Sequence, residues 1–134
     1  MNDKPKTELK IPITVEFEDV DSFRIVHHVK LVSYLERARL RLLYELGFDV
    51  ENNRYGIVMY NLDMRFSRPA RLMDKLEVSV KLKDAHAYQL FLSYKIRKDK
   101  TLIAKATTGL AFTDLLTQKL MPVPEDIARL AAES

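Results

Sequence analysis

The sequence contains no cysteine. This excludes disulfides, a thiolate nucleophile and cysteine-ligated zinc or iron–sulfur centres. No stretch of the chain approaches the length and apolarity of a membrane-spanning segment, and the first ten residues, MNDKPKTELK, are too polar for a secretory leader. We therefore expect a cytoplasmic protein with no membrane-inserted segment, in which residues 1–10 form a flexible N-terminal extension.

The composition is that of one ordinary globular domain. Of the 134 residues, 47% are hydrophobic and 31% are charged, which predicts a single domain over residues 1–134. The formal net charge is +3 and the isoelectric point is near 9.1, which suits an anionic partner such as a phosphorylated cofactor. Lysine and arginine are scattered along the chain, however, so we expect no nucleic-acid partner. Nucleic-acid binding is kept as a third hypothesis, which predicts steeply salt-dependent association.

The hydrophobic periodicity predicts one long helix among several strands. From Leu31 to Leu46 apolar residues recur at helical intervals, and Gly47 is a suitable stop. Elsewhere apolar and polar residues alternate with a period of two, which is typical of strands. The predicted strands cover residues 11–17, 57–68, 76–83, 89–97 and 102–113, with a polar loop at 51–54, turns at 84–86 and 98–100, and a short helix after Pro124.

This order of elements predicts an α+β fold. Strands joined by short turns pair in antiparallel fashion, so a single curved sheet of about five strands would wrap the one long apolar helix. The second face of the sheet is also partly apolar, because Phe91, Gly109 and Ala111 fall on the later strands. A monomer cannot bury such a face, which favours association of copies.

The stretch from Val15 to Arg39 carries the clearest functional signal. A short strand runs into Asp19 and Asp21, then into His27 and His28, and then into the helix. Free backbone N–H groups and the dipole at a helix start polarise a carbonyl, and a carboxylate beside them suits acyl transfer. On its own, Asp21 could also be a loop residue or a cap, and Asp19 is more simply a structural hydrogen-bond acceptor. The adjacent histidines lack the spacing of a shared ligand set, so we expect no metal.

A pattern of residues extends this signal along the chain. In the first part of the pattern, an aromatic residue is followed by a D-x-D pair, a V-x-H-like segment and a helix that contains Y-x-E-R-A-R. In the second part, a P-A step and then an aspartate precede another strand. These residues are Phe17, Asp19, Asp21, Val26, His28, Tyr34, Glu36, Arg37, Ala38, Arg39, Pro69, Ala70 and Asp74. Together they resemble the hotdog-fold acyl-CoA thioesterases of the 4-hydroxybenzoyl-CoA thioesterase type, including the bacterial Tol-Pal-associated branch, over nearly the full length of the chain.

The resemblance implies a fold, a reaction and two catalytic groups. In the hotdog fold one long central helix is wrapped by a curved antiparallel sheet. The reaction would be hydrolysis of an acyl-CoA, or as a second choice of an acyl-carrier-protein thioester, to a free acid. Asp21 would act as nucleophile or general base, and the backbone amide at about His28 would hold the thioester oxygen. No cofactor is implied beyond the coenzyme A of the substrate, and the other partner would be the chain itself, in a homodimer that assembles to a tetramer.

Four further residues are candidates for substrate binding. They are Tyr34, Arg68, Arg71 and His86. Guanidinium groups such as those of Arg68 and Arg71 suit the phosphates of coenzyme A, although both could be ordinary solvated charges. Tyr34 could line a pocket, but its place on the helix also suits the core. His86 lies at a predicted turn where relatives that bind coenzyme A often carry basic residues.

Two departures from the family pattern motivate a second functional hypothesis. Ser22-Phe23-Arg24 stands where a glycine usually follows the catalytic aspartate, which removes free access to positive φ. Lys30-Leu31 replaces the polar and aromatic pair that is common at the start of the helix. The alternative is a catalytically silent hotdog protein that binds an acyl-CoA or a protein partner.

Overall fold

The computed structural model describes residues 7–48 and 55–133. The described residues form helix α1 (His28–Glu45) and the shorter helix α2 (Glu125–Glu133), together with a single 3-10 turn at Phe17–Asp19. The strands are β1 (Glu8–Thr14), β2 (Tyr55–Phe66), β3 (Lys75–His86), β4 (Gln89–Lys98), β5 (Thr101–Asp114) and β6 (Leu120–Met121).

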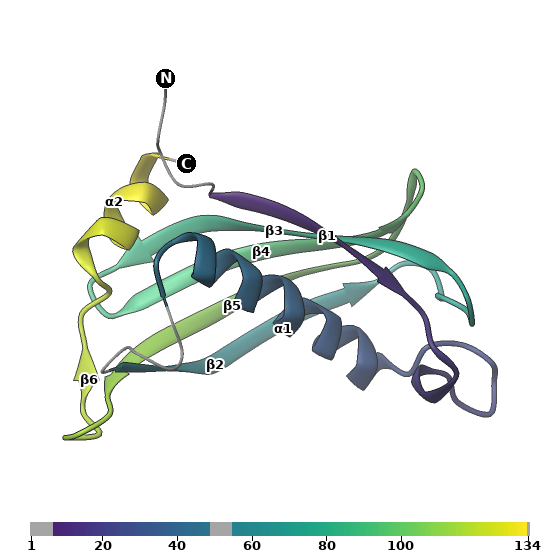
Figure 1. Cartoon of the computed structure of the whole chain (residues 1–134), viewed down its shortest axis with the longest axis horizontal. Coiled ribbons are helices and arrows are strands. Elements are labelled where there is room, and N and C mark those ends of the chain that lie inside the picture. The colour runs from purple at the N-terminus through teal and green to yellow at the C-terminus, as the bar shows by residue number, and fades with distance from the viewer. Residues whose placement is uncertain (1–6, 49–54, 134) are drawn as a thin grey trace.

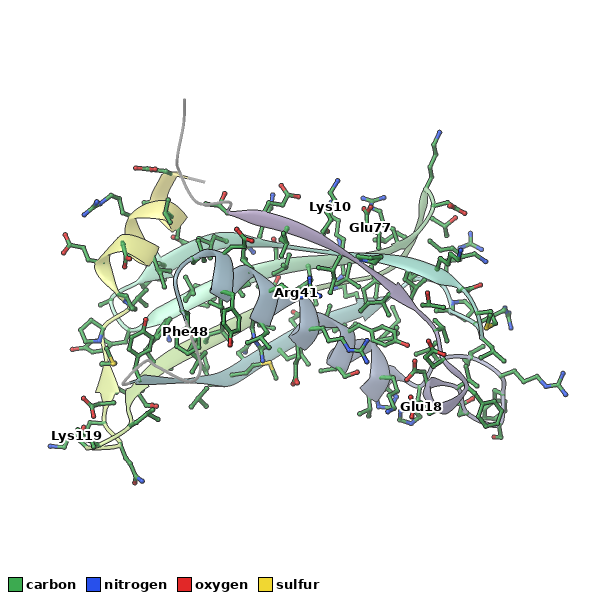
Figure 2. All side chains as sticks on the ribbon, viewed as in Figure 1. Lys10, Glu18, Arg41, Phe48, Glu77 and Lys119 are labelled. Carbon is green, nitrogen blue, oxygen red and sulfur yellow. The ribbon has the colours of Figure 1, made fainter. Side chains whose placement is uncertain are left out.

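All of the strands belong to one antiparallel sheet. Their order is β1-β3-β4-β5-β2, and the short β6 pairs with β5. Helix α1 runs across one face of this curved sheet, and α2 lies beside one end (Figure 1). Figure 2 places Glu18 beside the loop that precedes α1 and Phe48 near the opposite end of the helix.

Strand β2 does not pair with β3, which follows it in the chain. It pairs with β5 at one edge of the sheet, whereas β3 lies near the other edge beside β1. The connection between them therefore crosses the end of the sheet and meets the segment before α1. There the Val26 N–H donates to the carbonyl of Ala70 at 2.8 Å, and Ile25 forms a β-bridge with Arg71. This crossing brings two distant parts of the sequence together at the start of the helix.

The core lies between α1 and the sheet. One stripe of the helix is buried, with residues at the i, i+3, i+4 and i+7 spacing of an amphipathic helix. Loss of a leucine buried to this degree, such as Leu42, generally costs about 2–5 kcal/mol of stability. The buried residues of α1 are Leu31, Tyr34, Leu35, Ala38, Leu42 and Leu43, and they face alternate residues of the strands such as Val78, Val80, Leu90, Leu92, Ile96, Leu110 and Phe112.

The predicted α+β arrangement of a long helix and an antiparallel sheet is confirmed, but two boundaries differ. Helix α1 begins at His28 rather than Leu31, because His27 caps it: its Nδ1 accepts the Val29 N–H at 3.2 Å. Strand β1 covers Glu8–Thr14 instead of residues 11–17. Residues 8–10 pair with β3, so they do not belong to a flexible extension, and residues 1–6 lie outside the described part of the chain.

Two further expectations are corrected on the other strands. Strand β2 covers Tyr55–Phe66 instead of residues 57–68. Residues 84–86 were expected to form a turn, but they continue β3 and pair with β4 after a register shift between Leu82 and Asp84. The two-residue strand β6 was not predicted, because it is too short to show a periodicity. The loop expected at 51–54 lies outside the described residues.

The sheet face away from α1 carries the apolar residues that the sequence placed there. Phe91 pairs with Gly109, and Ala111 pairs with Val58. The ring of Tyr60 lies so close to Gly109 that a Cβ at this position would be 2.7 Å from it, so any side chain here would displace the end of the Tyr60 ring. Whether copies associate through this face stays a prediction, as does the cytoplasmic location.

Neither helix in the described part of the chain has both the length and the apolarity that a bilayer crossing requires.

Candidate functional site

The segment from Asp19 to His27 forms a short hairpin in front of α1. At its base the His27 N–H donates to the carbonyl of Asp19 at 3.1 Å, and Val20 and Val26 form a β-bridge. Closer to the tip, the Asp21 N–H donates to the carbonyl of Ile25 at 3.0 Å. The hairpin thus fixes Asp21 relative to the first residue of the helix.

The side chain of Asp21 is held by its own turn. Its Oδ1 accepts the Phe23 N–H at 2.8 Å, and its carbonyl accepts the Arg24 N–H at 2.9 Å. Oδ2 has no protein partner in the described part of the chain. Arg24 has φ of 64°, which is the left-handed conformation that a glycine would normally supply. The turn therefore forms although the usual glycine is missing.

The start of α1 leaves one backbone donor free. The Val29 N–H is bound by the His27 side chain, and the Lys30 N–H donates to the His27 carbonyl at 2.8 Å. Within residues 7–48 and 55–133 the His28 N–H has no hydrogen-bond acceptor. The first turn also carries no acidic side chain, so no carboxylate of the helix itself offsets the positive end of its dipole.

A hollow of about 460 Å³ opens at this position. Asp21 and His28 line one side of it and Arg68 the other. The His28 ring stacks on the His27 ring at 4.3 Å between centroids and meets the edge of Phe66 at 6.5 Å. Of the residues predicted from the sequence, the structure brings these three together: the aspartate, the first helical residue and one arginine.

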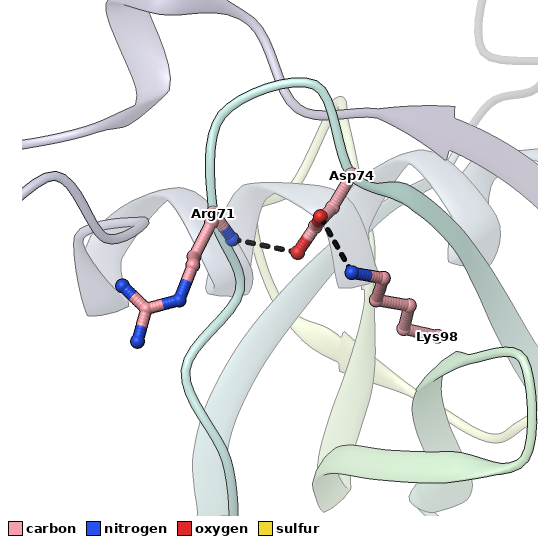
Figure 3. Close-up of polar contacts among 3 residues, drawn as sticks. All are labelled: Arg71, Asp74 and Lys98. Carbon is pink, nitrogen blue, oxygen red and sulfur yellow. Dashed lines mark hydrogen bonds and ion pairs between the residues drawn. The ribbon is translucent and has the colours of Figure 1, made fainter.

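Arg71 lies in an adjacent hollow rather than beside Asp21. This second hollow, of about 370 Å³, shares Arg68 with the first and also includes Arg71, Asp74 and Lys98. Asp74 accepts the Arg71 backbone N–H at 2.9 Å and the Lys98 Nζ at 2.9 Å (Figure 3). Burial alone would raise the pKa of Asp74, but these two hydrogen bonds and the charges of Lys98 and Arg71 together hold it below its ordinary value.

Tyr34 lies in the core instead of on the wall of a pocket. Its side chain has no exposed surface, and its hydroxyl donates to Asp19 Oδ2 at 2.7 Å. Burial, and secondarily this hydrogen bond, raises the pKa of Tyr34 far above its ordinary value. The expected contact between Tyr34 and a substrate is therefore not formed from this position. The structural hydrogen bond expected for Asp19 is confirmed.

His86 lies far from Asp21, at the end of β3. It lines an apolar hollow of about 550 Å³ on the outer face of the sheet, together with Tyr60, Tyr88 and Leu120. Its Nε2 is 3.5 Å from Asp84, and its ring meets the edge of Phe91 at 5.6 Å. The described chain therefore does not bring His86 to the Asp21 hollow.

Sequence reasoning missed several residues that line the Asp21 hollow. Ile25, Phe66 and Ser67 all border it. Phe66 and Ser67 carry no chemical signature, and they reach the hollow only because β2 ends beside the start of α1. The P-A step at Pro69 and Ala70, which also line the hollow, was the one sequence signal near this end of β2.

Comparison with known proteins agrees with this geometry. The chain is 27% identical over 125 residues to the acyl-CoA thioester hydrolase YbgC of Escherichia coli O6:H1, which covers 90% of this chain and 93% of the relative. It is 25% identical over 120 residues to the acyl-CoA thioesterase YbgC of Haemophilus influenzae, which covers 87% and 88% of the two chains.

A solved thioesterase structure resembles the chain as well. The 1,4-dihydroxy-2-naphthoyl-CoA thioesterase Slr0204 of Synechocystis superposes with a TM-score of 0.83 at 19% identity, over 94% of this chain and 96% of that one. This likeness concerns the fold alone, and it confirms the predicted hotdog fold. Residues 15–130 match the model of the thioesterase-like superfamily. The chain therefore belongs to the thioesterase-like superfamily, the family that its residue pattern predicted.

Proposed function

We propose that this protein hydrolyses an acyl-CoA thioester to a free carboxylic acid and coenzyme A. One observation carries the proposal: Asp21, with a partly exposed side chain, and His28, whose amide has no acceptor among the described residues, border the same hollow at the start of a helix. The names of the curated relatives supply the substrate class. Neither group needs a metal or a redox cofactor to act on a thioester.

The two groups have complementary roles in the proposed reaction. The His28 N–H, at the positive end of the α1 dipole, would donate to the thioester oxygen as negative charge develops on it. Asp21 would act through Oδ2, because Oδ1 is already bound to the Phe23 N–H. As a general base it would take a proton from the attacking water and pass it to the departing thiolate. As a nucleophile it would form a mixed anhydride, expel the thiolate, and be released by water. Either route consumes one water and yields one acid and one thiol.

We propose that Arg68 binds the phosphates of coenzyme A. It borders both the Asp21 hollow and the adjacent one, so a substrate whose thioester lies at Asp21 could extend past Arg68 toward Arg71. Arg68 has no ion-pair partner among the described residues, whereas Lys98 is already bound to Asp74. A planar guanidinium suits bidentate contact with phosphate.

A homodimer through β2 is the partner proposal that the fold supports best. β2 is an edge strand of 12 residues, and unpaired edges of this length readily pair with another chain. Its apolar side chains are well exposed: Val58 is 49%, Tyr60 48% and Phe66 54% accessible. We expect Leu62→Lys, which places a charge on this edge, to shift the mass measured by light scattering toward the monomer. The matched control is Leu116→Lys in the β5–β6 loop, and equal masses for both variants would contradict pairing through β2.

Steady-state hydrolysis of a panel of aliphatic and aromatic acyl-CoAs tests the enzymatic proposal. Thiol release is followed for the wild type and for Asp21→Asn, which keeps the size of the side chain and removes the carboxylate. We expect kcat to fall by about 10²–10⁴-fold in this variant, and to stay unchanged in the control Asp126→Asn at the exposed start of α2. If no acyl-CoA is turned over while one binds tightly, the catalytically silent alternative replaces the enzyme.

A further inference from the structure

We propose that Asp19 and Tyr34 form a positioning pair that fixes the Asp21 hairpin against α1. The inference rests on the thioester hydrolysis proposed above, since it assigns these residues to that reaction. Neither side chain touches the hollow: Asp19 is 6% exposed and Tyr34 is completely buried. They would act by holding the carboxylate of Asp21 and the amide of His28 at a fixed separation.

Asp19 is the residue on which the contacts of this region converge. Its Oδ2 accepts both the Tyr34 hydroxyl at 2.7 Å and the Glu16 N–H at 3.0 Å. Its carbonyl accepts the N–H of His27, the residue directly before the helix, at 3.1 Å. One buried residue therefore joins the residue before the 3-10 turn, the residue that leaves the hairpin, and the second turn of α1.

The covalent positions of the two reacting groups make these contacts important. Asp21 is two residues after Asp19, and His28 is one residue after His27. A shift of Asp19 relative to the helix would therefore be passed on to both groups. Burial of Tyr34 keeps its hydroxyl protonated, so it remains a donor to Asp19 throughout the neutral range. Misplacement of a reacting group by about 1 Å can cost on the order of 10²-fold in rate.

A second buried tyrosine provides the matched control. Tyr94 is 2% exposed, and its hydroxyl is bonded to Thr108 at 2.8 Å, a contact that links β4 to β5. The two tyrosines thus share residue type, burial and a side-chain partner. They differ in what the partner holds: Asp19 holds the hairpin, whereas Thr108 lies within the sheet.

The first experiment compares Tyr34→Phe with Tyr94→Phe. Both variants lose one buried hydroxyl, so we expect similar decreases in melting temperature. In Tyr34→Phe we expect kcat to fall by about tenfold to a hundredfold with KM within about twofold of the wild type, because binding contacts stay in place. In Tyr94→Phe both constants should stay near the wild type. Equal kcat for the two variants would overturn the positioning role.

The second experiment applies one substitution at two neighbouring sites. Asn keeps an acceptor oxygen for the Tyr34 hydroxyl and for the Glu16 N–H, so Asp19→Asn should retain most of the wild-type kcat. Asp19→Ala has no such acceptor and should lose most of the kcat. Asp21→Asn should lose nearly all of it, because there the charge itself reacts. If Asp19→Asn were as inactive as Asp21→Asn, Asp19 would take part in the chemistry, and the positioning assignment would fall.

Hydrogen exchange separates this inference from the proposed function. The amides of Asp21 and His27 are bound inside the hairpin, so they should exchange faster in Tyr34→Phe than in the wild type or in Tyr94→Phe. This readout needs no substrate. Unchanged exchange at both amides would overturn the positioning pair. A wild type that turns over no acyl-CoA would refute the proposed function, whatever the exchange result.

Discussion

The two ends of α1 differ in how completely their backbone groups are bonded. At the C-terminal end Gly47 has φ of 92°, and the chain folds back: the Gly47 N–H donates to the Tyr44 carbonyl at 3.0 Å and the Phe48 N–H to the Leu43 carbonyl at 2.8 Å. This pair of bonds is a Schellman motif. Phe48 is buried and packs against Tyr55 at 5.2 Å between ring centroids. The end is closed both by hydrogen bonds and by packing.

The N-terminal end is closed only in part. His27 caps the Val29 N–H, but the His28 N–H has no acceptor in the described part of the chain, and His28 lines a hollow together with Asp21. Stability would favour a side chain that bonds this amide, and an acidic residue in the first turn, which α1 lacks. One end of the helix is fully bonded, while the other leaves a backbone donor that the proposed reaction would use.

Removal of the His28 N–H should have the largest effect of the changes within α1 itself. His28→Pro removes the amide proton together with the imidazole. Proline suits the first position of a helix, and His27 already has the extended conformation, φ −65° and ψ 139°, that a residue before proline prefers. Because the amide makes no bond within the described chain, the melting temperature should stay close to that of the wild type. We expect kcat to fall by about 10²–10³-fold, as for other oxyanion donors.

His28→Ala is the companion variant, because it removes the imidazole and keeps the amide. If the backbone donor is the active group, this variant should keep most of the kcat that His28→Pro loses. His86→Ala, at the distant outer hollow, should change neither kcat nor KM. Equal losses in the proline and alanine variants would assign the role to the imidazole instead.

The two caps of α1 allow the ends to be compared directly. His27→Ala removes the N-cap, and Gly47→Ala forces a Cβ into the left-handed region. Each should lower the free energy of unfolding, measured by urea titration, by about 1 kcal/mol. Only His27→Ala should also lower kcat, because only that end adjoins the proposed site. A comparable loss of kcat in Gly47→Ala would show that general destabilisation, not the local cap, affects activity.

The sequence predicted the closed end of the helix better than the open one. Gly47 is a recognisable stop because only glycine takes positive φ without strain, and the structure ends α1 there. The start was placed three residues late because a histidine side chain serves as the cap, and histidine is not among the usual capping residues. The family pattern led to Asp21 and His28. It could not lead to Phe66 or Ser67, because their position depends on β2 pairing with β5 across the sheet.

Strain in the hairpin should be measurable as a smaller effect. Arg24 holds φ of 64°, which costs about 1–2 kcal/mol for a residue with a side chain. Glycine would relieve this, although its greater freedom in the unfolded chain offsets part of the gain. We expect Arg24→Gly to raise the free energy of unfolding by about 0.5–1 kcal/mol. Ser22→Gly, at a neighbouring position without positive φ, should lower it. A loss in both variants would mean that the Arg24 side chain stabilises the turn.

The smallest expected effect concerns the connection that packs against the hairpin. Asp74 is bound by Lys98 and by the Arg71 N–H, and its folded-state pKa is lowered from the unfolded value of 3.8. Its contribution to stability is therefore present above that value and is lost as the pH falls through the lower, folded pKa. The Lys98 side chain is 47% exposed, so solvent screening should limit the contribution to less than about 1 kcal/mol.

Urea unfolding at pH 7, 5 and 3 can detect this contribution. The difference in free energy of unfolding between the wild type and Asp74→Asn should be constant from pH 7 to pH 5 and should shrink toward pH 3. Asp99→Asn in the exposed turn between β4 and β5 provides the control, because Asp99 has no ion-pair partner in the described part of the chain. A difference that does not change with pH would mean that hydrogen-bond geometry, and not the charge of Asp74, secures this connection beside the open end of α1.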